Sequence, residues 1–205
     1  MSVGRMNRWA WIVILLPLSI AYAESKEDYY SAATPLHLGI EYYEPIEDDR
    51  NIRTWNLNMY YPVGAIEDIN LSFDAVLTAT YATGDITQLE GELFEGTLRD
   101  VNYKNSAVGI GPGILADLRL LEMGQLSFHV DAGISAILYN KNFPAEGDCY
   151  NFMERVGFAL KFPLENNQSV GIGCYGMHVS NGQGTGPRNP SYDAEGMRLT
   201  YEFRF

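Results

Sequence analysis

The stretch from Tyr175 to Gly196, YGMHVSNGQGTGPRNPSYDAEG, concentrates side chains that can hydrolyse an ester. His178 and Ser180 are two residues apart, and Asp193 and Glu195 follow in the same stretch. A serine hydroxyl becomes a strong nucleophile when a neighbouring histidine removes its proton, and a carboxylate then orients that histidine. Alternate residues of a strand share one face, so His178 and Ser180 can meet if this segment is extended. The chemistry therefore depends on the structure of the flanking segments.

The end of the chain predicts a β-strand of a membrane barrel. Its last residues, GMRLTYEFRF, place an apolar or aromatic side chain at every second position from Met197 to Phe205. This period of two is the pattern of a strand. An alternating last strand that ends on Phe resembles the terminal strand of bacterial outer-membrane barrels, which faces lipid on one side and the lumen on the other.

The same alternation recurs in seven upstream segments, which brings the number of predicted strands to eight. The seven segments are residues 36–42, 54–63, 71–81, 108–120, 126–138, 152–162 and 170–180. Alternation alone also fits a soluble lipocalin-like barrel, in which the apolar side chains point inward. Against that alternative, the polar face combines many glycines, which suit the narrow interior of an eight-stranded barrel, with five acids and five bases. These charged residues are Glu41, Asp74, Asp117, Asp131, Glu202, Arg119, Arg155, Lys161, Arg198 and Arg204.

We therefore predict an all-β fold, an eight-stranded antiparallel transmembrane β-barrel of the outer-membrane type. Short connections at 64–68, 121–124 and 164–168 are predicted to be periplasmic turns. Longer ones at 44–52, 82–105, 140–150 and 181–194 are predicted to be external loops, as this class of barrel prefers. In this orientation His178 and Ser180 lie at the external end of the seventh strand and face outward, towards lipid.

The N-terminus predicts a secretory signal peptide over residues 1–23, and the barrel then occupies residues 24–205. Arg5 and Arg8 precede an apolar run, and Ala-Tyr-Ala at 21–23 fits a cleavage site. Loss of these two arginines changes the formal charge from −12 to −14. Such an acidic protein is a poor partner for nucleic acid. The expected location is the cell outer membrane.

With that context, one motif becomes specific. His178-Val179-Ser180-Asn181, then Asn189-Pro190, then an acid three residues beyond Pro190, resembles the C-terminal signature of the outer-membrane lipid A 3-O-deacylase family. The resemblance implies a barrel with a Ser-His-acid triad on its outer surface, which removes an ester-linked acyl chain from lipopolysaccharide.

The same resemblance assigns roles to individual residues. Ser180 would be the nucleophile, His178 the general base and Asp193 the orienting acid. Asn189, together with a backbone N–H near Gly182, would form the oxyanion hole. The expected partners are lipid A or lipopolysaccharide and the outer membrane, with no metal and no cofactor, and a homodimer is left open.

The sequence departs from the family pattern at two positions. Ser191 stands where the family commonly has a glycine after Asn-Pro, and Asp193 stands where the acid is typically Glu. Glu195 is therefore an alternative acid.

Two other interpretations are weighed against the catalytic one. The chain could be a non-catalytic structural or adhesion barrel in which His178 and Ser180 are rim residues. A second set with triad composition, Ser127, His129 and Asp131, points into the lumen, and we predict that it forms an interior hydrogen-bond network.

Overall fold

The computed structural model describes residues 35–90, 99–165, 168–182 and 190–204. Within these ranges the chain forms eight strands and one short 3-10 helix, and no helix is long and apolar enough to cross a membrane. The elements are β1 (Pro35–Pro45), β2 (Arg50–Ile66), η2 (Glu67–Ile69), β3 (Leu71–Glu90), β4 (Arg99–Met123), β5 (Leu126–Tyr139), β6 (Tyr150–Pro163), β7 (Ser169–Ser180) and β8 (Tyr192–Arg204). The predicted signal peptide at 1–23 lies outside the described residues.

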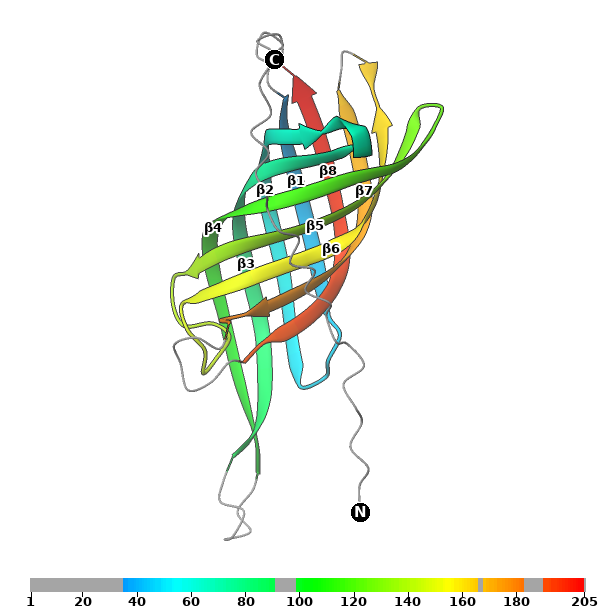
Figure 1. Cartoon of the computed structure of the whole chain (residues 1–205). Helices are drawn as coiled ribbons and strands as arrows, with labels where there is room; N and C mark the ends of the chain where they lie inside the picture. Colours follow the sequence, from blue (N-terminus) through cyan, green and yellow to red (C-terminus); the bar gives the residue numbers. More distant parts are fainter. Residues whose placement is uncertain (1–34, 91–98, 166–167, 183–189, 205) are drawn as a thin grey trace. The chain divides into compact units, whose positions relative to one another are not determined.

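The strands close into one antiparallel barrel, as predicted (Figure 1). Each strand pairs with the next, and β8 returns to pair with β1 from Pro35↔Arg204 to Pro45↔Ala194. Around the closed wall of the barrel no sheet edge is open, so the backbone groups there find partners within the sheet. A bilayer offers no water to satisfy such groups, and a closed barrel is one of the two structures that can cross it.

The apolar residues of the alternating pattern lie on the outside of the barrel. Leu57 and Ile110 have exposed fractions of 54% and 55%, whereas Asn56 and Asn58, on either side of Leu57, are buried. An apolar outer surface around a polar interior is the arrangement that lipid requires. The lipocalin-like alternative predicted the opposite arrangement and is wrong.

The middle of the lumen is filled by a network of charged side chains. The Glu41 carboxylate is fully buried and accepts hydrogen bonds from Arg198 Nε at 2.6 Å, Asn56 Nδ2 at 2.8 Å and Arg155 Nη1 at 3.2 Å. Arg198 Nη1 also donates to both oxygens of the Asp131 carboxylate. The predicted pairing of acids and bases is therefore confirmed in this layer.

Two further predicted interior bases behave differently. Arg119 lies beside a register shift in β4, is exposed, and bonds to Glu122 and Asn70 at the rim. The side chain of Arg204 lies outside the described residues.

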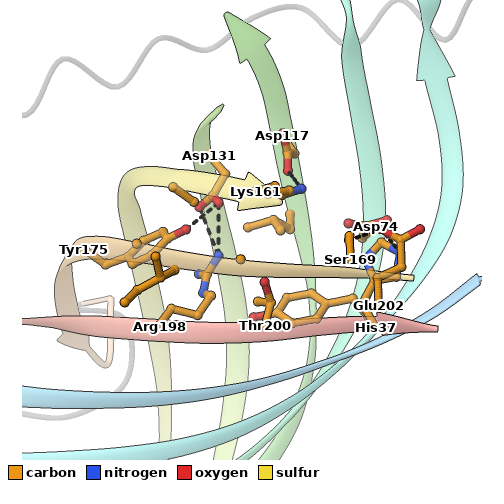
Figure 2. A pocket seen from close by; sticks show the side chains of 16 residues that line it. His37, Asp74, Asp117, Asp131, Lys161, Ser169, Tyr175, Arg198, Thr200 and Glu202 are labelled. Atoms are coloured by element: carbon orange, nitrogen blue, oxygen red, sulfur yellow. Dashed lines mark hydrogen bonds and ion pairs between the residues drawn. The ribbon is translucent and has the colours of Figure 1, made fainter. Parts of the chain in front are cut away.

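A small cavity of about 30 Å³ lies in the polar part of the lumen, towards the start of β3 and the end of β6 (Figure 2). Its labelled lining residues are His37, Asp74, Asp117, Asp131, Lys161, Ser169, Tyr175, Arg198, Thr200 and Glu202. Glycines make room for the aromatic side chains around it. A Cβ atom on Gly157 would come within 2.4 Å of the Tyr175 ring, and one on Gly39 within 2.9 Å of the Tyr60 ring. This cavity therefore has room for only a few waters.

The opposite half of the lumen is apolar, which the sequence pattern did not predict. Tyr43, Ile52, Phe143, Val179 and Tyr192 are each at most 1% exposed and belong to one cluster of buried side chains. Several of its members, among them Ile52 and Phe143, come from segments predicted to be loops. This half lies at the predicted external end of the barrel, so a hydrophobic core closes that end.

Two predicted external loops are shorter than expected. Only residues 46–49 separate β1 from β2, and β3 and β4 continue to Glu90 and from Arg99 as a hairpin that projects past the other strands (Figure 1). The projecting part carries polar cross-strand contacts, such as Asn102 Nδ2 donating to Asp85 at 2.6 Å. Since water surrounds both faces there, the strands continue without an alternating apolar pattern.

We predict that Glu41→Gln lowers the free energy of unfolding by about 3–5 kcal/mol, because it leaves buried guanidinium groups without their carboxylate. Urea unfolding of the barrel in detergent micelles measures this change. The control is Glu122→Gln, which breaks an exposed pair with Arg119 and should cost less than about 1 kcal/mol. Equal effects of the two substitutions would contradict a stabilising role for the interior network.

Candidate active site

Strands β7 and β8 place the candidate residues on the outer face, at the predicted external end of the barrel. Along β7 the side chains of Met177 and Val179 are buried, and His178 and Ser180 between and after them are partly exposed. Val179 is 0% exposed because it packs into the apolar core of the lumen. This inward packing fixes the outward direction of its two neighbours.

His178 and Asp193 form a hydrogen-bonded pair across the β7–β8 ladder. They are register partners, and His178 Nδ1 lies 2.7 Å from Asp193 Oδ1. Since a carboxylate can only accept, Nδ1 carries the hydrogen, and a neutral ring then keeps a lone pair on Nε2. The side chains of His178 and Asp193 are 27% and 35% exposed, so the pair remains accessible from outside the barrel. A general base of the Ser-His-acid type needs this tautomer.

Ser180 is the last residue of β7 and lies on the same face as His178. In the part of the chain that the structure describes, the only hydrogen bond of the His178 ring goes to Asp193, and none joins it to Ser180. Catalytic hydrogen bonds are often long until substrate is bound. The structure therefore brings His178 and Asp193 together, and Ser180 lies at the next position on the same face of β7.

The other candidates lie around this pair. Gly182 has φ of +70°, in the left-handed region that favours glycine, and turns the chain just after β7. Asn189 lies outside the described residues. Glu195 is exposed on β8, and its register partner on β7 is Gly176, not His178. The geometry therefore favours Asp193 over Glu195 as the partner of His178.

Two charged residues near the pair were not assigned to the site from sequence. Glu154 on β6 is exposed and is the register partner of His178 on the side away from Asp193. Arg50, at the start of β2, donates from Nη1 to the Ser191 carbonyl oxygen and, at 3.1 Å, to Ser191 Oγ. The sequence alone shows that Glu154 is a charged residue on an otherwise apolar strand face. Its position beside His178 and the contact of Arg50 with Ser191 depend on how the strands are paired.

The segments next to the pair are held from inside the barrel. Tyr192, directly before Asp193, is 0% exposed, and its hydroxyl lies 3.2 Å from Thr54 Oγ1 on β2. Directly after Ser180, the buried Asn181 donates through Nδ2 to Asp148 at 3.0 Å. The link between β5 and β6 therefore supports the end of β7, and β2 supports the start of β8.

Comparison with known families decides which proteins this chain is related to. The model of the family described as lipid A 3-O-deacylase (PagL) matches residues 55–202, more than half of the chain. The chain belongs to the lipid A 3-O-deacylase family. It is an outer-membrane β-barrel, and the predicted location and fold are confirmed. The match spans His178, Ser180 and Asp193.

One solved structure shows the same fold. The crystal structure of the outer membrane enzyme PagL has a TM-score of 0.50 and 16% sequence identity, and the alignment covers 82% of this chain and 99% of that one. The solid-state NMR structure of outer membrane protein AlkL in DMPC lipid bilayers has a TM-score of 0.37 at 14% identity, covering 88% of this chain and 95% of that one. No curated protein matches the sequence.

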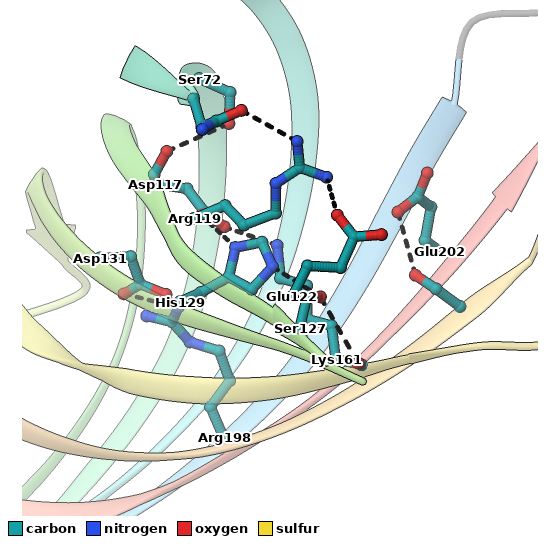
Figure 3. Close-up of polar contacts among 12 residues, drawn as sticks. Ser72, Asp117, Arg119, Glu122, Ser127, His129, Asp131, Lys161, Arg198 and Glu202 are labelled. Atoms are coloured by element: carbon teal, nitrogen blue, oxygen red, sulfur yellow. Dashed lines mark hydrogen bonds and ion pairs between the residues drawn. The ribbon is translucent and has the colours of Figure 1, made fainter. Parts of the chain in front are cut away.

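A second set of Ser, His and acid side chains lies inside the barrel of this chain (Figure 3). His129 Nε2 is 2.9 Å from Ser127 Oγ, and its Nδ1 is 2.6 Å from Asp117 Oδ1. The acid differs from the prediction, because Asp131 accepts hydrogen bonds from Arg198 and Tyr175 instead. His129 is 8% exposed and points into the lumen.

This interior set has partners that suit a structural network. The Asp117 carboxylate also accepts a hydrogen bond from Lys161 Nζ at 2.5 Å, and the cavity of about 30 Å³ beside it is too small for an acyl chain. In the described ranges, no group of three His, Cys, Asp or Glu side chains is placed to hold a metal ion.

We predict that Ser127→Ala leaves lipid A deacylation by folded protein nearly unchanged, because Ser127 contacts only the interior network. Release of hydroxy fatty acid from purified lipopolysaccharide in detergent micelles measures the rate. A complete loss in a correctly folded variant would mean that the interior set, and not the outer pair, is the reactive one.

Proposed function

We propose that this protein is a lipid A 3-O-deacylase that hydrolyses an acyl ester of lipopolysaccharide with Ser180 as nucleophile, His178 as general base and Asp193 as orienting acid. The observation that carries the proposal is the 2.7 Å hydrogen bond between His178 and Asp193 on the lipid-facing side of the barrel, with Ser180 on the same face. A polar pair at this place needs a reason, because side chains that face lipid are normally apolar. Membership of the deacylase family supplies one.

The proposed reaction proceeds through an acyl-enzyme. His178 Nε2 takes the proton of Ser180 as Oγ attacks the ester carbonyl carbon, and Asp193 stabilises the imidazolium that forms. The bond to the sugar oxygen then breaks, and His178 returns the proton to that oxygen. Water, activated by the same histidine, cleaves the acyl–serine ester, releases the fatty acid and restores Ser180.

The negative oxygen of the tetrahedral intermediate needs hydrogen-bond donors. We assign this role to a backbone N–H near Gly182 and to the Asn189 side chain. The positive φ of Gly182 supports the first assignment, because it turns the backbone away from the β7 ladder just beyond the nucleophile. The assignment of Asn189 rests on the motif alone.

The external position of the pair suits the substrate. Lipid A lies in the outer leaflet, and its ester bonds lie close to the boundary between headgroups and acyl chains. His178 and Ser180 occupy the end of β7 at that side of the barrel. Residues 1–23 are proposed as the signal peptide that directs export, whereas the homodimer has no support in these findings.

Mass spectrometry of lipid A tests the nucleophile. Cells that express the wild-type protein should lose one hydroxyacyl chain from lipid A, and cells that express Ser180→Ala should not, because removal of a triad nucleophile typically costs about 10⁶-fold in rate. Both proteins should reach the outer membrane as folded, heat-modifiable barrels. Identical lipid A from both strains, with wild-type protein present and folded, would favour the non-catalytic barrel.

Substitution of the two acids tests the assignment of Asp193. Asp193→Asn should lower the deacylation rate by about 10³- to 10⁴-fold, because the amide cannot hold the tautomer that leaves Nε2 free. Glu195→Gln removes one charge two residues along the same face and serves as the matched control, with little effect on rate. The reverse order of effects would assign the acid to Glu195.

A further inference from the structure

The start of β8 is held by an arginine from a strand that does not pair with β8. β1 lies between β2 and β8 in the sheet, but it ends at Pro45, opposite Ala194, and Arg50 of β2 reaches Ser191 beyond that end. Its Nη1 donates to the Ser191 carbonyl oxygen and to Ser191 Oγ, the latter at 3.1 Å. Ser191, which accepts both hydrogen bonds from Arg50, is two residues from Asp193, the proposed acid.

A backbone hydrogen bond also connects the link between β1 and β2 to Asp193 itself. The N–H of Ile46, in the link between β1 and β2, donates to the Asp193 carbonyl oxygen at 3.2 Å. Within the same link, Arg50 N donates to Glu47 O at 3.3 Å. The short link 46–49 and Arg50 thus form one unit that contacts both Ser191 and Asp193.

We propose that Arg50 is a positioning residue for the proposed deacylase site: it fixes the Ser191 segment so that the Asp193 carboxylate meets His178 Nδ1. This inference rests on the proposed function for its catalytic consequence. Arg50 makes its hydrogen bonds to Ser191 and makes none to the nucleophile or the base. The geometric need is strict, because a displacement of about 1 Å at a catalytic group can cost about 10²-fold in rate.

The side chain of Ser191 fits this role. A residue without a polar side chain would offer Arg50 only its carbonyl oxygen. Ser191 adds a hydroxyl that accepts a second hydrogen bond from Arg50. Two acceptors on one residue fix both the position and the direction of a planar guanidinium better than one.

The competing role for Arg50 is recognition of a phosphate on lipid A. Its guanidinium is already engaged within the protein, because Nη1 contacts Ser191 and Nε lies 3.5 Å from the Glu47 carboxylate. Its side chain is 33% exposed. The neighbouring carboxylate also makes this a poor place for an anion, so the contacts favour positioning over substrate binding.

Kinetics of the purified full-length barrel on lipopolysaccharide in detergent micelles test the proposal. Arg50→Gln should lower kcat by about 10- to 100-fold with little change in KM, and Arg50→Lys, which keeps a charge and one donor direction, should recover part of the loss. Ser191→Ala removes only the hydroxyl acceptor and should give a smaller loss of the same kind. The matched control is Arg99→Gln, which removes the same charge from an exposed residue of the projecting hairpin.

A second readout does not depend on activity. Nitrogen-15 NMR of histidine-labelled protein reports the Nδ1 and Nε2 signals of His178, identified by their loss in His178→Ala. Arg50→Gln should shift the His178 signals towards those of Asp193→Asn and leave the His129 signals in place, whereas Arg99→Gln should move neither. The shift of one histidine and not the other excludes a general loss of structure.

The outcomes separate this inference from the proposed function. A rise in KM at unchanged kcat would overturn positioning and assign Arg50 to the substrate. Wild-type kcat and unmoved His178 signals in folded Arg50→Gln and Ser191→Ala would also overturn it. If the wild type releases no fatty acid but the His178 signals still shift both in Arg50→Gln and in Ser191→Ala, which removes no charge, the proposed function fails and the positioning role stands.

Discussion

Closure of the backbone ladder between β1 and β8 is the constraint on which the rest of the structure depends. A barrel with every strand paired on both sides has only two faces, and alternate side chains must take one or the other. In β7 this rule sends Met177 and Val179 inward and therefore His178 and Ser180 outward. A shift of one residue in register would exchange the two sets and bury the candidate site in the lumen.

The contents of the lumen make that register costly to change. At mid-height, Glu41, Asp131, Arg155 and Arg198 satisfy one another's charges, and each depends on its partners being at the same level. At the external end, the apolar core locks Val179 and Tyr192 directly behind the candidate site. His178 and Asp193 are therefore held in place by their buried neighbours, although neither His178 nor Asp193 is itself buried.

The sequence predicted the architecture because alternation is a local property of each strand. It predicted the outward face of His178 and Ser180 for the same reason. It could not predict which inward acid His129 would meet, because Asp117 is a diagonal neighbour across the β4–β5 ladder and Asp131 is taken by Arg198. It also missed the apolar external core, since Phe143 enters the lumen from a link between strands. Arg50 and Ser191, which are 141 positions apart, could be connected only by the closed sheet.

The apolar core at the external end also determines where water can come from. In the proposed reaction, hydrolysis of the acyl-enzyme consumes one water for each fatty acid released. Among the described residues, the aromatic and aliphatic side chains behind β7 lie between the candidate site and the polar cavity in the other half of the lumen. Under that proposal the lipid would reach the site from the membrane beside the barrel, and the water would come from the aqueous phase at the predicted external end.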